Sequence, residues 1–142
     1  VLLTHGHFDH IWGVKGLIKA CREDGNEDVK VYACADEQRL LASPGMNVSE
    51  AMGREEAVTA DVWVKDGEEL EIAGIKCKCI QTPGHTVGGM CYYFADEKTL
   101  FCGDTLFHGS IGRTDFVNGS ASALVRSVKE KLMEGNLLVI NF

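Results

Sequence analysis

A cluster of histidines near the first residue constrains this chain more than any other feature. Three histidines and one aspartate lie within six residues, in the run Thr4-His5-Gly6-His7-Phe8-Asp9-His10, directly after the apolar segment Val1–Thr4. We expect that segment to be a β-strand, and side chains on the loop that follows it can turn towards one point. Gly6 lets this loop bend without a Cβ clash. Because imidazole and carboxylate groups suit zinc, iron and manganese, the cluster predicts a metal site.

Two later segments offer similar ligands at the ends of predicted strands. His85 follows a strand predicted at Ile75–Gln81, and Asp104 follows one predicted at Thr99–Cys102. A lone aspartate at the end of a strand is more often a helix cap or a turn residue. However, loops at strand ends commonly gather on one edge of a layered fold. We therefore expect His85 and Asp104 to lie close to the first cluster.

Helical and strand patterns are interspersed along the chain. Apolar residues of Ile11–Asp24 and of Ser120–Met133 fall on one helical face, and Ala35–Ala42 and Ser49–Val58 also look helical. The predicted strands are Val29–Cys34, Asp61–Lys65, Glu69–Ile72, Ile75–Gln81, Gly89–Ala95, Thr99–Cys102 and Leu137–Ile140. A glycine-rich loop is expected between the last β-hairpin and the last helix. This order of elements indicates a layered α/β fold.

Composition and charge argue against several classes of protein. Hydrophobic residues make up 45% and charged residues 25% of the chain, as in globular proteins. The net charge of -7 gives no electrostatic footprint for a nucleic-acid backbone, and no basic run favours a membrane surface. No apolar stretch approaches the length of a membrane span. We therefore expect neither nucleic acid nor a membrane as a partner.

The cysteines are interpreted as small buried hydrophobic residues. They lie mostly in apolar segments and form no Cys-x-x-Cys pair, so neither a thiolate zinc site nor a redox dithiol is indicated. Such thiols are typical of a reducing compartment, and together with the lack of a signal peptide they predict a cytoplasmic protein. The six cysteines are Cys21, Cys34, Cys77, Cys79, Cys91 and Cys102.

The three ligand segments, in this order, resemble the metallo-β-lactamase superfamily, in which His-x-His-x-Asp-His is a signature. The resemblance covers essentially the whole chain and implies one domain, residues 1–142, with the α/β fold of an αββα four-layer sandwich, present in part. It implies two divalent metal ions as cofactors, with zinc preferred and iron or manganese as alternatives. The implied ligands are His5, His7 and His85 for one ion, Asp9 and His10 for the second, and Asp104 as a bridge between them.

The stretch from Gly103 to Phe116 narrows the resemblance to the bacterial branch that is similar to glyoxalase II, the hydroxyacylglutathione hydrolases. This branch implies hydrolysis of a small-molecule thioester or ester by a hydroxide formed from metal-bound water, whose pKa falls to roughly 7. Asp9 would be both a ligand and the catalytic residue that orients the nucleophile. Arg113 and Asp115 are expected to form an ion pair that fixes the loop, although Arg113 could instead bind a substrate carboxylate.

Two departures from the family pattern leave other functions open. Family members have strands before the first motif and a final histidine ligand in a Pro-Gly-His turn, and neither feature is found in this sequence. We therefore expect a partial domain with an incomplete second metal site. One alternative is a persulfide dioxygenase of the same fold, with a single iron held by His5, His85 and Asp104. Another alternative is an inactive fragment or a binding module.

Overall fold

The computed structural model describes residues 1–133, and the strand predicted at Leu137–Ile140 lies outside them. The helices are α1 (Phe8–Ile11), α2 (Val14–Glu23), α3 (Gln38–Ala42) and α4 (Ala121–Ser127), with 3₁₀ turns η1 (Ala35–Glu37) and η2 (Gly103–Thr105) and a π-helical stretch η3 (Val128–Met133). The strands are β1 (Tyr32–Cys34), β2 (Val62–Val64), β3 (Glu69–Ile72), β4 (Ile75–Gln81), β5 (Met90–Phe94), β6 (Thr99–Phe101), β7 (Leu106–Phe107) and β8 (Ser110–Ile111).

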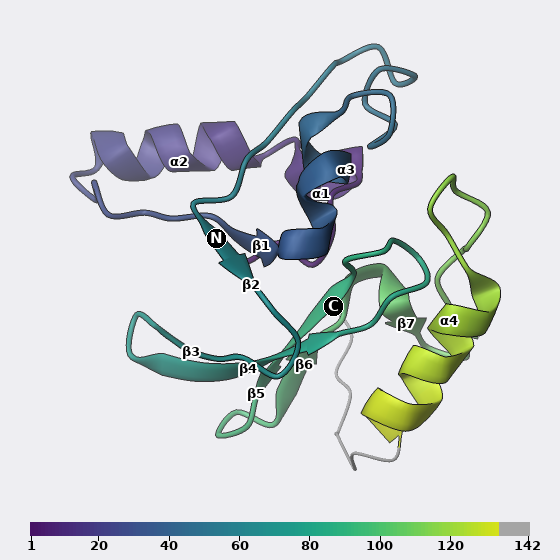
Figure 1. Ribbon diagram of the computed structural model, residues 1–142. Coiled ribbons are helices and arrows are strands. Elements are labelled where there is room, and N and C mark those ends of the chain that lie inside the picture. Colours follow the sequence, from purple (N-terminus) through teal and green to yellow (C-terminus); the bar gives the residue numbers. More distant parts are fainter. Residues whose placement is uncertain (134–142) are drawn as a thin grey trace.

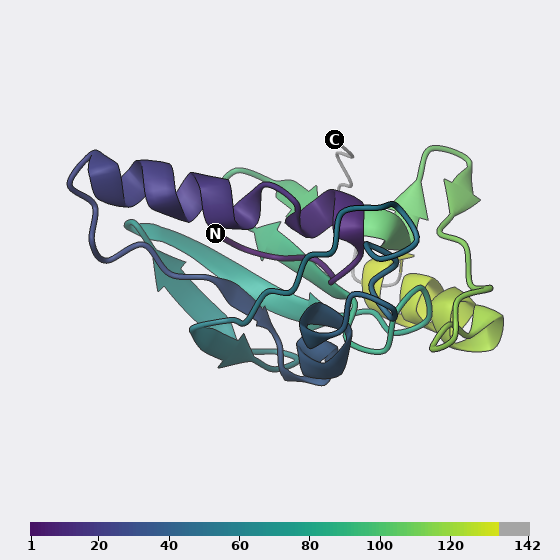
Figure 2. The same ribbon diagram turned by 90° about the horizontal axis from the view of Figure 1, so that it is seen from above.

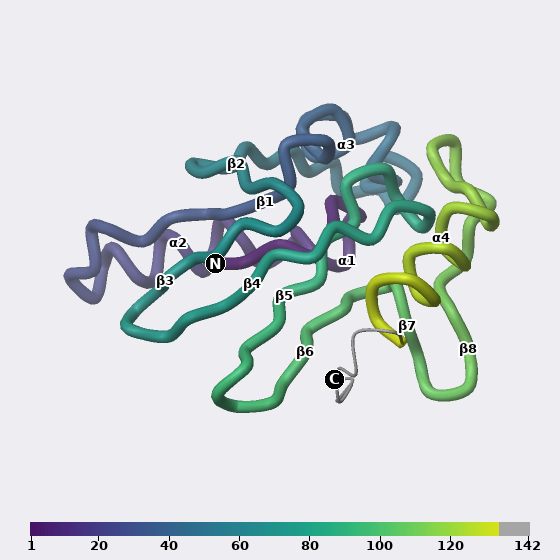
Figure 3. The backbone as a smooth tube through the Cα atoms, turned by 60° about the horizontal axis from the view of Figure 1, so that its bottom comes forward, coloured from purple at the N-terminus to yellow at the C-terminus, as the bar shows by residue number. Residues whose placement is uncertain are grey.

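The described elements form four layers (Figure 1). Helices α1 to α3 lie on one side of the parallel pair β1–β2, to which Leu2 adds a bridge to Tyr32. The antiparallel sheet β3-β4-β5-β6 forms the next layer, and its strands follow one another as a meander (Figure 3). Helix α4 and η3 cover its other face, whereas β7 and β8 form a small separate hairpin (Figure 2). The predicted αββα sandwich is therefore confirmed, as part of such a domain.

Alternation along the strands explains why the central sheet has helices on one side and strands on the other. Side chains two residues apart on a strand share a face. Cys77 and Cys79 of β4 pack with Tyr92 of β5 in the core shared with β1 and β2, and the Tyr92 hydroxyl donates to the carbonyl of Leu3, 2.9 Å away. Their strand neighbours Ile80 and Cys91 point to the opposite face, where they pack against Val128 and Leu132 of η3.

The helix predicted at Ser49–Val58 is wrong, because this segment consists of turns followed by extended chain. Buried polar side chains form local hydrogen bonds with its backbone. The Asn47 amide donates to the carbonyl of Glu56, 2.8 Å away, and the Ser49 hydroxyl accepts from the Glu56 N–H at 2.9 Å. Such side-chain bonds compete with the helical backbone bonds, and here they replace them.

Other predicted boundaries shift for local reasons. The helix expected at Ile11–Asp24 is α2, which begins only at Val14 after a turn at Trp12-Gly13, and the short helix α1 before this turn was not predicted. The strand expected at Val1–Thr4 makes a single bridge, at Leu2. The glycine-rich loop contains the β7–β8 hairpin, and Ser120 caps α4 by accepting from the Ala123 N–H.

The six cysteines all lie within the described residues and form no disulfide there, and five of them are buried. This agrees with the interpretation of these residues as small apolar side chains. Among the described helices, none combines the length and the apolar character that crossing a membrane requires.

Candidate metal site

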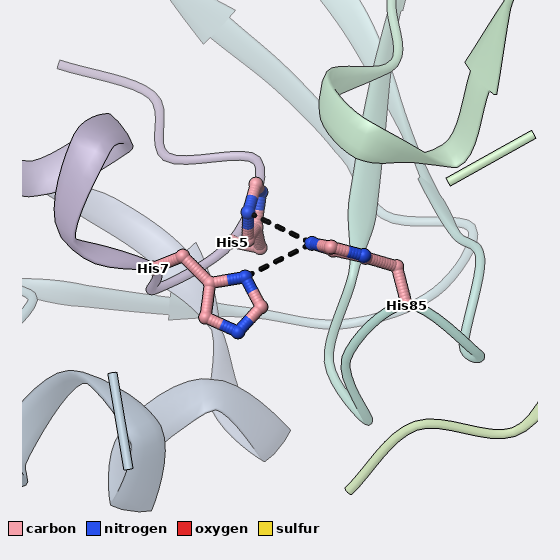
Figure 4. Close-up of side chains that lie close together, drawn as sticks. All are labelled: His5, His7 and His85. Atoms are coloured by element: carbon pink, nitrogen blue, oxygen red, sulfur yellow. Dashed lines mark hydrogen bonds between the residues drawn. The ribbon is translucent and has the colours of Figure 1, made fainter. Parts of the chain in front are cut away.

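The predicted ligands come from three loops that meet at one edge of the two β-layers. His5 and His7 flank Gly6 immediately before α1, His85 lies between β4 and β5, and Asp104 lies in η2 after β6. His5, His7 and His85 are all buried, and their rings point towards one another (Figure 4). Residues up to 80 positions apart in the sequence are thereby brought into contact.

Three ring nitrogens converge in the first group of candidate ligands. His85 Nε2 lies 2.9 Å from His7 Nδ1 and 3.3 Å from His5 Nε2. One ligand atom from each of these residues lies within 4.8 Å of the others. A cluster of three imidazoles is a donor set that suits zinc and iron.

The hydrogen bonds of the outer ring nitrogens orient this group. His85 Nδ1 lies 2.8 Å from the carbonyl oxygen of Arg113, which can only accept, so this nitrogen carries a proton. His85 Nε2 faces the other two rings and Asp104 Oδ2, which is 3.6 Å away. His5 Nδ1 faces the Thr4 hydroxyl at 3.3 Å. Ring nitrogens that converge in a buried position fit a bound cation, and such outer hydrogen bonds are typical of metal-binding histidines.

A second group shares His5 and adds His10 and Asp104. Asp104 Oδ1 lies 3.3 Å from His10 Nε2, while its other oxygen faces His85. One carboxylate oxygen thus faces His10 and the other faces His85, and the bridging role that the family resemblance implies for Asp104 stays a prediction. Asp9 is more peripheral: its Oδ2 lies 3.8 Å from His10 Nε2 and its side chain is 56% exposed.

Burial and charge act differently on the two groups. Burial lowers the pKa of His5 well below its usual range. Burial also lowers the pKa of His7, to about 4, and the neighbouring His85 adds to this effect. The rings of His5 and His7 are therefore uncharged at neutral pH, the form in which imidazole binds a metal ion. In contrast, the hydrogen bond with Asp104 raises the pKa of His10, and the same bond lowers that of Asp104. In the second group, His10 and Asp104 therefore each favour the charged form of the other.

The loop after β8 covers one side of the histidines. The ring of Phe116 packs on His7 with centroids 4.3 Å apart, and the Arg113 guanidinium lies 4.6 Å from the centroid of that ring. Arg113 also binds Asp115 through two hydrogen bonds of 2.7 Å. The predicted ion pair is confirmed. The guanidinium of this pair also contacts Phe116, and the backbone carbonyl of Arg113 binds His85.

Sequence reasoning missed several residues that shape the site. These residues support the candidate ligands through side-chain or backbone contacts and are not candidate ligands themselves: Thr4, Glu37, Gly112 and the carbonyl of Arg113. Of these, only Glu37 carried a signal in the sequence. It precedes Leu40 and Leu41 by three and four residues, a helical spacing that places an acidic side chain on the buried face of a helix.

Residues 1–140 match the family model described as the metallo-beta-lactamase superfamily. The chain belongs to this superfamily. The solved structure of BLEG-1, a B3 metallo-beta-lactamase, is 33% identical in sequence and has a TM-score of 0.86. The match covers 99% of this chain and 66% of the BLEG-1 chain. The structure of TTHA1623 in a di-iron-bound form is 28% identical, with a TM-score of 0.76, over 99% of this chain and 67% of its own.

Curated relatives include metallo-hydrolases. The probable metallo-hydrolase YqgX of Bacillus subtilis is 38% identical over 135 residues, which cover 94% of this chain and 61% of the relative. The hydroxyacylglutathione hydrolase GloC of Haemophilus influenzae is 31% identical over 139 residues, covering 96% and 63%. The chain thus spans about three fifths of the length of these relatives.

Proposed function

We propose that this chain supplies the metal centre of a hydrolase that cleaves a small thioester, of the hydroxyacylglutathione type, with two divalent metal ions and zinc as the preferred metal. One observation carries the proposal: the two oxygens of Asp104 face two different histidines, Oδ2 towards His85 of the first group and Oδ1 towards His10 of the second. Such an arrangement suits a pair of ions that share a carboxylate. The GloC relative and the di-iron form of TTHA1623 support this reading.

The proposed ligands are His5, His7 and His85 for the first ion, Asp9 and His10 for the second, and Asp104 for both. Bound metal would supply Lewis acidity and a more acidic water at neutral pH. Asp9 presents an exposed carboxylate next to His10, where it can accept a hydrogen bond from an attacking water. The ring of Phe116 shields His7 from solvent, and Asp104 keeps His10 oriented towards the same point.

The test combines metal analysis with an assay of thioester cleavage. We expect close to two metal ions per chain and release of free thiol from a hydroxyacyl-glutathione thioester. Replacing an outer partner of a metal ligand typically costs 10–100-fold, so Asp104→Ala is expected to lower kcat/KM at least about 100-fold. His108→Ala is the matched control, because this exposed histidine lies between β7 and β8, outside both ligand groups.

The same measurements separate the alternative functions. One equivalent of iron, with oxygen consumption on a persulfide and no thiol release from the thioester, would replace the hydrolase by the dioxygenase. Less than one ion per chain and no turnover of either substrate would leave a binding module or an inactive fragment. Full activity of Asp104→Ala would refute the proposed role of the bridging carboxylate.

A further inference from the structure

A buried carboxylate connects the two loops that carry the histidines of the first group. Glu37 is 1% exposed and lies in η1, beside the buried Leu40 and Leu41 of α3. Its Oε2 accepts a hydrogen bond from the N–H of Gly6 at 3.0 Å, and its Oε1 accepts one from the N–H of Gly88 at 2.8 Å. One side chain thus binds two loops that are far apart in the sequence.

The two glycines allow this close approach. A Cβ added to Gly6 would lie 3.1 Å from the Leu41 side chain and 3.2 Å from Glu37 Oε2, and one added to Gly88 would lie 2.6 Å from the Glu37 backbone nitrogen and 2.7 Å from its Cγ. Neither glycine has a positive φ. What these positions require is therefore space against Glu37 rather than an unusual backbone conformation.

The position of each contact relates it to the histidines. Gly6 stands between His5 and His7, and Gly88 follows His85 by three residues. The carboxylate therefore holds the loop of His5 and His7 against the loop of His85. Between these loops, His85 Nε2 lies 2.9 Å from His7 Nδ1 and 3.3 Å from His5 Nε2.

We propose that Glu37 is a positioning residue that sets the distance between the two histidine loops, and through it the geometry and metal affinity of the His5, His7 and His85 group. The inference rests on the proposed function only in taking these three residues as metal ligands. Glu37 itself lies in neither candidate ligand group.

The chemistry of the position favours this role over simple packing. Placing a carboxylate in a buried site costs free energy unless it is hydrogen-bonded. Burial raises the pKa of Glu37, while the Thr86 side chain and the N–H groups of Gly88 and Gly6 oppose that rise. An apolar side chain next to Leu40 and Leu41 would avoid this cost. A carboxylate, however, offers two acceptor oxygens on one rigid group, so it can fix two backbone N–H groups relative to each other.

Metal affinity in Glu37→Gln tests the inference, because an amide keeps the size of the side chain but only one of its two acceptors. Affinity is measured by competition of Zn²⁺ with a chromogenic chelator, and ligand geometry by the absorption spectrum of the Co²⁺-substituted protein. We expect the affinity to fall 10–100-fold, the range for partners of metal ligands, and the Co²⁺ bands to shift. Asp36→Asn is the matched control: it removes a charge from the neighbouring residue, which is exposed and binds the Gln81 side chain. Its affinity and spectrum should stay like those of the unchanged protein.

Glu37→Asp separates reach from charge. It keeps the negative charge but is one methylene shorter, so it cannot bind both loops, and it is expected to behave like Glu37→Gln. If it bound Zn²⁺ as tightly as the unchanged protein, or if Glu37→Gln left affinity and spectrum unaltered, the inference would be overturned. Failure of the unchanged protein to bind Zn²⁺ would instead refute the proposed function. If Glu37→Gln does not fold, Glu37→Asp alone decides.

Discussion

At the scale of single residues, Gly112 limits what can stand beside the proposed bridging carboxylate. A Cβ at this position would lie 1.8 Å from the carbonyl oxygen of Asp104 and 3.4 Å from His85 Nδ1. The next residue, Arg113, supplies the carbonyl that binds the same ring nitrogen. The backbone at residues 112 and 113 therefore supports Asp104 and His85 together.

We expect Gly112→Ala to lower both stability and metal affinity, because the loop must move away from Asp104 to make room. Forcing atoms into a packed site typically costs about 1–3 kcal/mol. Urea unfolding gives the stability, and chelator competition gives the affinity. Gly13→Ala serves as the control, since a Cβ there meets nothing within 4 Å. An affinity of Gly112→Ala equal to that of Gly13→Ala would contradict the expectation.

Residue-level prediction worked where the signal is local and failed where it is not. His5, His7 and His10 share one short motif, and His85 and Asp104 follow strands, so the convergence of the histidines with Asp104 could be predicted. The partner of a buried carboxylate depends on which loops meet it in space. The bonds from Glu37 to Gly6 and Gly88 span 31 and 51 residues, and no short-range pattern records them.

At the scale of elements, α2 carries a glycine that its helix does not need. Gly16 is an exposed residue of α2, and a Cβ there would meet no atom within 4 Å. Glycine in a helix is less favourable than alanine by roughly 0.5–1 kcal/mol. We expect Gly16→Ala to stabilise the protein by about that amount in urea unfolding. Gly25→Ala, just after the helix, should do the opposite, because Gly25 has φ 89°. A loss of stability in Gly16→Ala would show that this part of α2 is not helical in solution.

Element boundaries followed the periodic signals and missed the polar contacts. The pattern of Ala35–Ala42 correctly predicted a helical segment, because apolar side chains at helical spacing become buried. The segment Ser49–Val58 has similar composition, but the bonds of Asn47 and Ser49 to Glu56 replace helical bonds. Such choices depend on contacts that form only when the chain is compact.

At the scale of the whole molecule, the four layers follow from the order of helices and strands and from the two-residue alternation on β4 and β5. The sequence alone could not place the connections between layers, because these depend on single polar contacts. One of them joins the turn before β3 to the last helix: Lys131 Nζ donates to Asp66 Oδ2 and to the carbonyl of Gln81, each at 2.7 Å.

This connection predicts a pH-dependent part of the stability. Burial acts to raise the pKa of Asp66, but the hydrogen bonds from Lys131 and from the Gln81 N–H, with the charge of Lys131, prevail and lower it. Because the pKa in the folded state is below the unfolded value of about 3.9, the link stabilises the fold above that pH. Its contribution is lost as the pH falls through the lower, folded-state pKa.

Lys131→Met should therefore reduce the free energy of unfolding at pH 7 by no more than about 1 kcal/mol, since both side chains are partly exposed and solvent screens the pair. Below the folded-state pKa of Asp66 the difference from the unchanged protein should shrink without vanishing, because the bond to the Gln81 carbonyl does not titrate. Urea unfolding at pH 7 and at a pH below the folded-state pKa of Asp66 measures the two differences in stability. Lys129→Met is the control, because Lys129 is an exposed lysine two residues away. If the difference stayed constant across this range, Lys131 would act through packing and the Gln81 bond alone, and the charge of Asp66 would have no part in holding the last helix to the sheet.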